Sequence, residues 1–210
     1  YNMADSVIVG RYVGENALAA VGASYSFTNV FIMIAIGGGI GASVLTSQYL
    51  GAGKYREMKT SIYTFLLTFA ALSALLAVFG FCYNPWVLRS LQTPDNIYED
   101  AVLYLQIYFT GMPFMFMYNV LAANFNAMGK SGIPLGLLIF SSVLNVILDL
   151  VMVLRFGLGV AGVAIATVIA QGISAVISFS ILMYQLRQYQ TEEMPSLLDV
   201  GMLFAGVKIA

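Results

Sequence analysis

The chain has 210 residues, of which 60% are hydrophobic and only 9% are charged, whereas soluble domains are roughly 45–50% apolar and about 25% charged. Its 9 Lys and Arg residues against 10 Asp and Glu give a net charge of -1, without the basic excess that nucleic-acid binding requires. The lack of His and the single cysteine, Cys82, exclude His proton relays, His or Cys metal sites, Cys-His nucleophiles and intrachain disulfides from these residues.

Long apolar runs dominate the chain, and a helix needs about 20 mostly apolar residues to cross a hydrocarbon core about 30 Å thick. Residues 1–9 reach only about 14 Å as a helix, so we interpret them as the end of a span that begins earlier. Each of the later runs is long enough to cross: 17–50, 61–83, 101–123, 133–154 and 160–183. The predicted fold is an all-α bundle of about five full transmembrane spans plus the end of a first one.

The loops indicate how the bundle lies in the membrane, because Lys and Arg favour cytoplasmic loops. The loops after the second, fourth and sixth spans hold five of these residues, and the other loops hold three. The loop with Lys54 is therefore predicted to be cytoplasmic and residues 84–100 external. We expect a multi-pass protein of the cell membrane, in contact with the lipid bilayer.

Glycine and proline inside the spans indicate close packing or bending. Gly37 and Gly38 belong to a glycine-rich stretch of the second span, where helices can approach closely, and close packing alone is the favoured interpretation. Pro113 removes a backbone donor from the fourth span and predicts a kink, which suits a moving part and a static bundle equally. These three residues are the hinge candidates.

Met and aromatic side chains surround Pro113, and such side chains adapt to ligands of varied shape. On this basis Met112, Met115 and Phe116 are candidates for the wall of a cavity that binds amphipathic substrates. Contact with lipid or with the protein core is the favoured alternative for the same three residues, because membrane helices also place such side chains there.

Two carboxylates carry most of the functional argument. Asp5 and Asp149 are the only charged residues within the apolar runs, and an intramembrane carboxylate is costly enough to be a functional candidate. Asp5 lies six residues before Arg11, and Asp149 lies six before Arg155. At 1.5 Å per residue each carboxylate is about 9 Å below the same external boundary, so the two share a depth.

Helical spacing adds polar neighbours to this pair. Tyr1 lies four residues before Asp5, and Asn145 lies four before Asp149 on the same helix face. Thr167 reaches a similar depth on the returning sixth span. The sequence therefore predicts a cluster of oxygen-bearing side chains within the membrane.

Such a cluster suits a proton or a small hard cation. Carboxylate, amide and hydroxyl oxygens are ligands that Na⁺ accepts, and neighbouring buried carboxylates can share a proton because two adjacent negative charges repel. We predict an H⁺ or Na⁺ site at Asp5, Asn145, Asp149 and Thr167, with no other cofactor. The alternative is that these residues only join helices by hydrogen bonds.

Three stretches resemble the multidrug and toxic compound extrusion (MATE) transporters, in particular their DinF-like branch. They are YNMADSVIVGRYVGENALAAVG at 1–22, SQYLGAGKYREMK at 47–59, and the long stretch at 126–171 that contains NVILDLVMVLRFGLG. The resemblance covers nearly all of residues 1–184. It implies one six-helix lobe of a twelve-helix transporter, with residues 185–210 as a cytoplasmic linker toward a missing carboxy-terminal lobe.

The resemblance also implies a function and a site. Family members export organic cations and other amphipathic compounds in exchange for H⁺ or Na⁺, so the chain would be part of a multidrug antiporter and not an enzyme. The cation site of DinF-like members matches residues already selected by depth and spacing: Tyr1, Asp5, Asn145, Asp149 and Thr167. One difference is Leu150, where many relatives have proline.

Three alternatives stay open at this point. A lipid-linked saccharide flippase of the same superfamily should have a more cationic cavity than these spans provide. An intramembrane aspartyl protease also uses two carboxylates, but its motifs are absent, because Tyr1 is not adjacent to Asp5 and Gly157-Leu158-Gly159 is followed by Val160. A purely structural bundle would tolerate substitution of both Asp residues.

Overall fold

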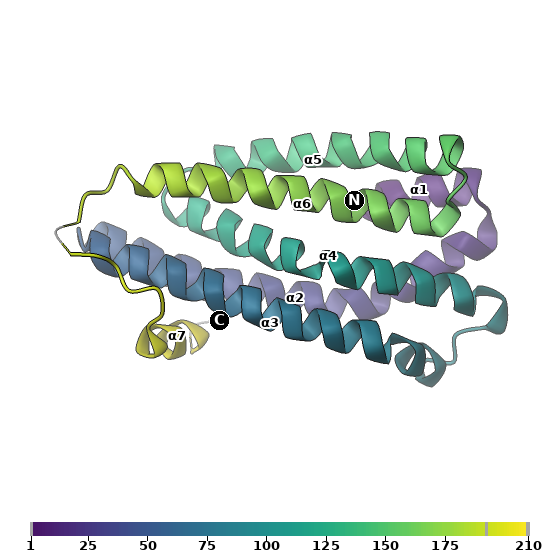
Figure 1. Ribbon diagram of the computed structural model, residues 1–210, viewed down its shortest axis with the longest axis horizontal. Helices are drawn as coiled ribbons and strands as arrows, with labels where there is room; N and C mark the ends of the chain where they lie inside the picture. Colours follow the sequence, from purple (N-terminus) through teal and green to yellow (C-terminus); the bar gives the residue numbers. More distant parts are fainter. Residues whose placement is uncertain (1, 192, 209–210) are drawn as a thin grey trace. The chain divides into compact units, whose positions relative to one another are not determined.

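The computed structural model describes residues 2–191 and 193–208, and this part of the chain is helical with no β-strand (Figure 1). The elements, in chain order, are α1 (Asn2–Tyr12), α2 (Glu15–Gly51), α3 (Tyr55–Ser90), α4 (Asp95–Ala127), α5 (Gly132–Leu150), the π-helix η1 (Val151–Arg155), α6 (Gly159–Leu186) and α7 (Val200–Val207). Among these residues, five helices are long and apolar enough to cross a membrane. The predicted helical membrane fold is confirmed.

The helices extend beyond the predicted apolar runs. The sequence predicts an apolar run at 61–83, for example, whereas α3 has 36 residues from Tyr55 to Ser90 and is about 54 Å long at 1.5 Å per residue. A helix does not stop where the hydrocarbon stops, since its backbone hydrogen bonds are made within the helix on either side of that boundary. Hydropathy locates the part of each helix that lies in lipid, and it underestimates the full length of the helix.

The turns after α2 and α4 are built alike. Gly53 and Gly129 each have φ of +71°, a left-handed conformation that glycine adopts without the steric penalty of a side chain. The N–H of Lys54 donates to the Tyr49 carbonyl at 2.9 Å, and the N–H of Lys130 donates to the Phe125 carbonyl at 2.8 Å. This is the Schellman arrangement, which satisfies the last carbonyls of a helix and ends it.

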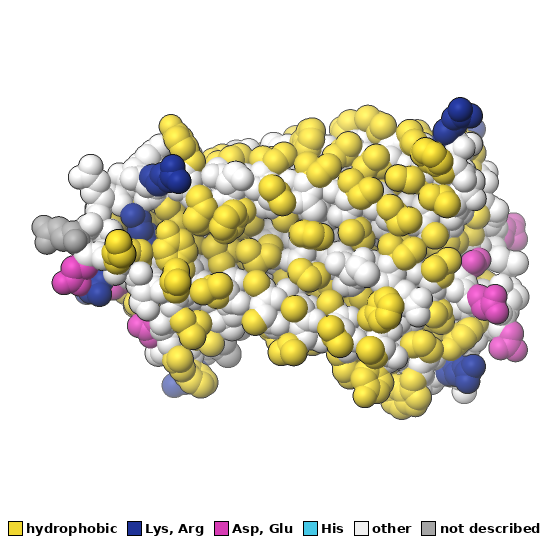
Figure 2. Space-filling view, viewed as in Figure 1, with side chains coloured by type: hydrophobic (Ala, Val, Ile, Leu, Met, Phe, Trp, Pro, Cys, Tyr) yellow, Lys and Arg dark blue, Asp and Glu magenta, His cyan; other side chains and the backbone are white. Residues whose placement is uncertain are grey.

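The described chain packs as two compact units. The first contains residues up to Phe31 together with Ala74–Phe114 and Ile139–Ile173, and the second contains Ile32–Ser73, Met115–Leu138 and the residues from Ser174 onward. Many large apolar side chains are exposed, and Figure 2 shows hydrophobic side chains spread along the visible face between the charged ends. Lipid is the environment in which such a surface is stable.

In the first unit, aromatic rings pack edge to face. The Phe27, Phe31 and Phe109 ring centroids lie 5.3 to 5.5 Å apart, a geometry favoured by the charge distribution of the rings. Gly80 of α3 lies against Phe109, and a Cβ at Gly80 would lie 2.3 Å from that ring. Glycine is therefore what lets α3 and α4 approach here.

In the second unit, a buried polar pair joins α2 to α4. The Thr46 hydroxyl donates to Oδ1 of Asn124 at 2.6 Å, and Nδ2 of Asn124 donates to the Val120 carbonyl at 2.8 Å. Both side chains are fully buried. Each polar atom of the Asn124 amide thus has a partner, so the pair can be buried without leaving that amide unsatisfied.

The substitution Asn124→Leu should destabilise the intact protein by about 1–3 kcal/mol, because it leaves the buried Thr46 hydroxyl without its acceptor. The unfolding midpoint of the purified protein in detergent measures this change. Asn126→Leu is the matched control, since Asn126 is on the same helix but exposed. Equal midpoints for the two variants would contradict a stabilising role for the pair.

The hinge candidates lie within continuous helices. α2 is unbroken through Gly37 and Gly38, and α4 is unbroken through Pro113. Gly38 lies against Phe69, where a Cβ would be 1.8 Å from the ring, whereas a Cβ on Gly37 would have no neighbour within 4 Å. Gly38 therefore has a close-packing role, as favoured from the sequence, and a hinge role for the three residues stays a prediction.

Candidate cation-coupling site

Four of the predicted site residues lie together in the first unit. Asp5 comes from α1, Asn145 and Asp149 from α5, and Thr167 from α6. The exposed fractions of the four side chains are 0%, 0%, 0% and 1%, respectively. The four side chains that depth and spacing selected therefore form one buried cluster, and their role as a cation site stays a prediction. The fifth predicted residue, Tyr1, lies outside the described residues.

α5 positions its two site residues by helical spacing. Ser141, Asn145 and Asp149 recur every fourth residue and are buried, whereas Ile139, Val143 and Ile147 are 53 to 59% exposed. The spacing of four puts each set on one face. α5 thus turns a polar stripe toward the protein and an apolar stripe outward, as expected for a helix whose outer face meets lipid.

A chain of hydrogen bonds joins the two carboxylates. Nδ2 of Asn145 lies 3.4 Å from Oδ1 of Asp149 and 3.1 Å from the Thr167 hydroxyl oxygen, and it donates to both. The Thr167 hydroxyl in turn donates to Oδ2 of Asp5 at 3.1 Å. The Asn145 amide and the Thr167 hydroxyl therefore link Asp149 to Asp5, and they connect α5, α6 and α1 in this way.

Three acceptor oxygens of the cluster have no hydrogen-bond partner among the described residues. They are Oδ1 of Asp5, Oδ1 of Asn145 and Oδ2 of Asp149, all buried. A buried polar atom without a partner costs roughly 1–3 kcal/mol, and more where it is charged. All three are acceptors, so they fit a proton or a hard cation and do not fit an anion. The described residues hold no cluster of three or more Cys, Asp and Glu, the pattern of a multi-carboxylate or thiolate metal site.

The backbone departs from α-helical geometry next to Asp149. The π-helix Val151–Arg155 follows Leu150 directly, and the N–H of Phe156 donates to the Val151 carbonyl five residues earlier. π-helical turns are rare in proteins, and those that occur are often found at functional sites. Leu150 is the residue directly before this π-helix, so the local departure occurs without a proline.

Sequence reasoning missed two tyrosines of α4. Tyr104 and Tyr108 are buried, with exposed fractions of 2% and 5%, and their rings stack with centroids 6.1 Å apart. Tyr104 also lines a cavity together with Met3, Ser6 and Val7 of α1. No spacing rule distinguishes these residues from the other tyrosines of the chain. The polar residues of α1 and α5, by contrast, stand out because their helices are otherwise apolar.

The predicted substrate-cavity residues are in the core. Met112, Met115 and Phe116 have exposed fractions of 0%, 6% and 0%, in agreement with the favoured alternative of core contact. A cavity of about 460 Å³ lies elsewhere, within the first unit between α1, α2 and α4. The described residues around it are mostly apolar: Met3, Ser6, Val7, Val21, Gly22, Tyr25 and Tyr104.

Apolar spans that enclose two linked carboxylates define the class of protein, a multi-pass membrane protein with the kind of interior found in ion-linked transporters. The MatE family model matches residues 1–151, and the chain belongs to this family. It is a family of transporters and not of enzymes.

Individual relatives agree with this assignment. The chain is 36% identical over 184 residues to "Probable multidrug resistance protein YoeA" of Bacillus subtilis, a match that covers 86% of this chain and 39% of that protein. It is 30% identical over 196 residues to "Probable multidrug resistance protein YpnP" of the same organism, covering 93% and 44%. The chain thus spans less than half of the length of these relatives.

Solved structures show the same fold. The structure described as "Crystal structure of MATE in the bent conformation" superposes with a TM-score of 0.89 at 22% identity, over 100% of this chain and 47% of that one. The relatives support neither the protease alternative, which would require an enzyme family, nor the flippase alternative.

Proposed function

We propose that this chain forms about half of a secondary antiporter that exports organic cations or other amphipathic compounds in exchange for H⁺ or Na⁺. Residues 1–184 would be its amino-terminal lobe, and residues 185–210 would lead to a carboxy-terminal lobe. The names of the two Bacillus relatives support multidrug export. The buried series of hydrogen bonds that links the Asp5 carboxylate to the Asp149 carboxylate supports ion coupling.

The unpartnered oxygens are the observation that carries the coupling proposal. Asp5, Asn145 and Asp149 each present one buried acceptor without a partner among residues 2–191 and 193–208, and these acceptors come from two different helices. A cation bound among them would stabilise one arrangement of α1 against α5 and α6. An ion can shift the equilibrium between two arrangements only by its difference in affinity for them.

This connection provides a route from ion binding to helix movement. Thr167 contacts Asp5 of α1 and Asn145 of α5 at the same time. When a proton or Na⁺ occupies the carboxylates, the charge that orients these hydrogen bonds changes, and so does the packing of the three helices. Export follows if the substrate leaves in the arrangement that takes up the cation from outside.

Efflux from proteoliposomes tests the proposal. The intact protein is reconstituted into liposomes that are loaded with a fluorescent lipophilic cation. An H⁺ gradient or an Na⁺ gradient is then imposed across the membrane. We expect substrate movement under one of the gradients and its loss when an ionophore for that ion collapses the gradient. Protein-free liposomes are the control. Movement at the control rate under both gradients would contradict antiport.

A further inference from the structure

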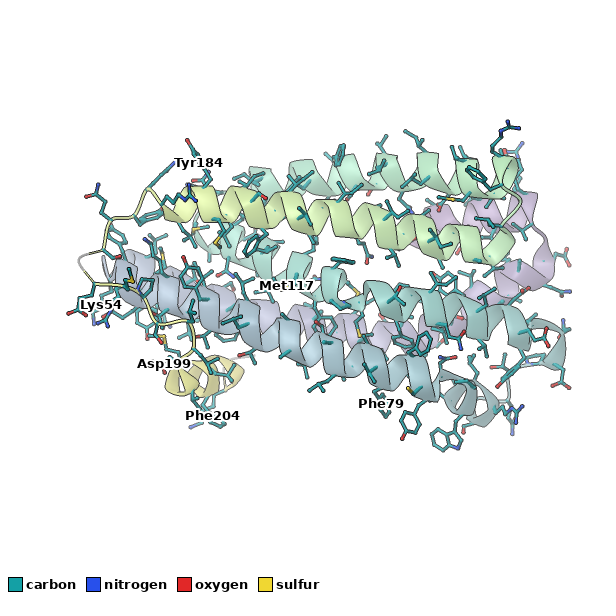
Figure 3. All side chains as sticks on the ribbon, viewed as in Figure 1. Lys54, Phe79, Met117, Tyr184, Asp199 and Phe204 are labelled. Carbon is teal, nitrogen blue, oxygen red and sulfur yellow. The ribbon has the colours of Figure 1, made fainter. Side chains whose placement is uncertain are left out.

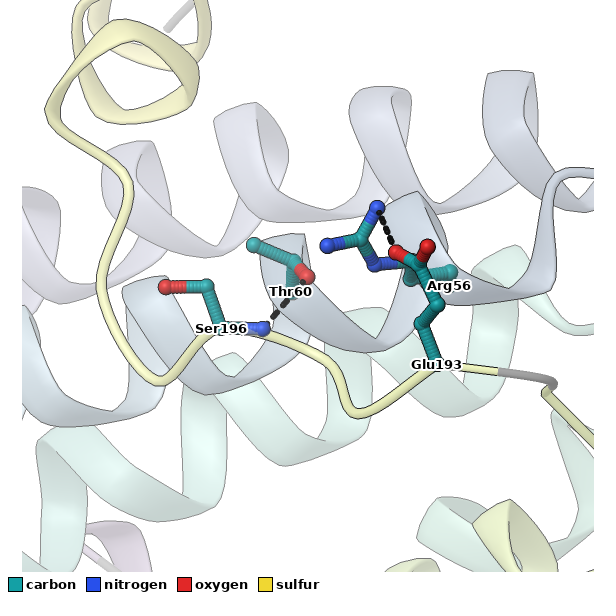
Figure 4. Close-up of polar contacts among 4 residues, drawn as sticks. All are labelled: Arg56, Thr60, Glu193 and Ser196. Carbon is teal, nitrogen blue, oxygen red and sulfur yellow. Dashed lines mark hydrogen bonds and ion pairs between the residues drawn. The ribbon is translucent and has the colours of Figure 1, made fainter.

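The segment after α6 is held along α3 in the second unit. The backbone N–H of Ser196 donates to the Thr60 hydroxyl at 3.1 Å (Figure 4), and the N–H of Asp199 donates to the Thr64 hydroxyl at 2.9 Å. Thr60 and Thr64 are one helical turn apart, and both are buried. We name residues 189–191 and 193–199 the strap.

Contacts at both ends of the strap hold it to the same helix. Glu193 forms an ion pair with Arg56 at 2.7 Å, which is exposed and therefore contributes little. At the other end Gly206 of α7 lies on the Phe65 ring, where a Cβ would be 2.2 Å from the ring. α7 is thus fixed against α3, close to Thr64.

The outward side of α7 is apolar. Asp199 begins the helix and accepts the Met202 N–H at 3.0 Å, and no charged residue follows within the helix. Val200 and Phe204 of α7, together with Leu197 and Leu198 just before the helix, are 53 to 67% exposed. Figure 3 shows Phe204 on the side of α7 that points away from α3. We name these four side chains the apolar face.

The attachment point on α3 lies where that helix changes from charged to apolar. Lys59 is its last charged residue before an uncharged run that begins at Ser61. Thr64 is five residues beyond Lys59, or about 7.5 Å along the axis. Helices that lie in a membrane interface bury their apolar side about 5–10 Å into the boundary between headgroups and acyl chains. The strap holds α7 at this level.

We propose that α7 is an interfacial helix and that its apolar face lies in the lipid at this end of the protein, positioned by the strap. Lipid is the occupant that fits, because the strap and α7 are attached to α3 at Thr64 and Phe65, within the apolar run that crosses the membrane and that also exposes Leu67. The strap then fixes the depth at which the chain approaches the bilayer after α6. This inference does not depend on the transported ion or substrate.

Fluorescence quenching at two positions tests the location of the apolar face. Phe204→Cys and Gln190→Cys are made in a cysteine-free form of the intact protein, labelled with an environment-sensitive fluorophore and placed in bilayers. Gln190 is the control because it is an exposed residue at the start of the strap. We expect brominated lipid to quench the probe at position 204 more than the probe at position 190, given the expected depth, and aqueous iodide to quench mainly position 190.

Two outcomes would overturn the proposal. Quenching of the position 204 probe by iodide to the same extent as the position 190 probe would place the face in water. Protection of the position 204 probe from both quenchers would place it against protein. Brominated-lipid quenching at position 204 that exceeds quenching at position 190 supports the lipid assignment.

A second variant tests the strap itself. Thr60→Val with Thr64→Val keeps the side-chain shape but removes both acceptors of the strap N–H groups. We expect the position 204 probe to lose its protection from iodide in this double variant. Thr68→Val, one turn further along α3, is the control and should leave the quenching unchanged. Unchanged quenching in the double variant would show that the strap does not position α7.

Discussion

The substitution Asp149→Asn in the intact protein is expected to abolish ion-driven efflux while the protein still folds. Asn has almost the same shape as Asp and keeps an acceptor for Nδ2 of Asn145, now 3.4 Å from Oδ1. It has no charge and binds no exchangeable proton. Loss of one unit charge about 4 Å from a bound cation removes about 4 kcal/mol at an effective dielectric constant of about 20, which corresponds to about a thousandfold in affinity.

Two measurements separate loss of coupling from loss of folding. Efflux in proteoliposomes reports coupling, and the thermal unfolding midpoint of the purified variant reports stability. Asp95→Asn is the matched control, because Asp95 is an exposed carboxylate at the start of α4 and should tolerate the change. Wild-type efflux with wild-type ion dependence in Asp149→Asn would instead support a purely structural role, in which the cluster only joins helices.

The clustering of the four polar side chains could be predicted from the sequence because helices are regular. A rise of 1.5 Å per residue and a turn of nearly four residues converted the positions of Asp5, Asn145, Asp149 and Thr167 into depths and faces. A polar residue is conspicuous in an apolar helix, and the cost of exposing it to lipid restricts it to the face that points into the bundle. The four hydrogen-bonded side chains lie where these two rules put them.

The strap could not be predicted in the same way. Its two buried hydrogen bonds are donated by backbone N–H groups of Ser196 and Asp199, which every residue except proline carries. The acceptors, Thr60 and Thr64, are common residues in membrane helices. The sequence indicates only a cytoplasmic linker after the sixth span. Tyr104 could not be predicted for a related reason. In a helix rich in aromatic residues, the sequence does not indicate which residues a buried tyrosine will contact.

The second large effect is expected at Gly38. A Cβ at this position would lie 1.8 Å from Cζ and 1.9 Å from Cε1 of Phe69. The Phe69 ring cannot easily move away, since it is 6% exposed and its centroid lies 6.2 Å from those of both Phe65 and Phe116. Overpacking of a core costs about 1–3 kcal/mol. Gly38→Ala should fall at the upper end of this range, as a lower unfolding midpoint of the intact protein.

Gly37→Ala is the matched control and also tests the hinge prediction. A Cβ at Gly37 has no neighbour within 4 Å, and alanine is favoured over glycine inside a helix by about 0.8–1.0 kcal/mol, so this variant should be at least as stable as the wild type. If the glycines act by packing, only Gly38→Ala lowers the midpoint. If they act as a hinge, both variants slow efflux, because both restrict the backbone of α2, and the midpoints need not differ. Equal midpoints with normal efflux in both variants would contradict the two interpretations together.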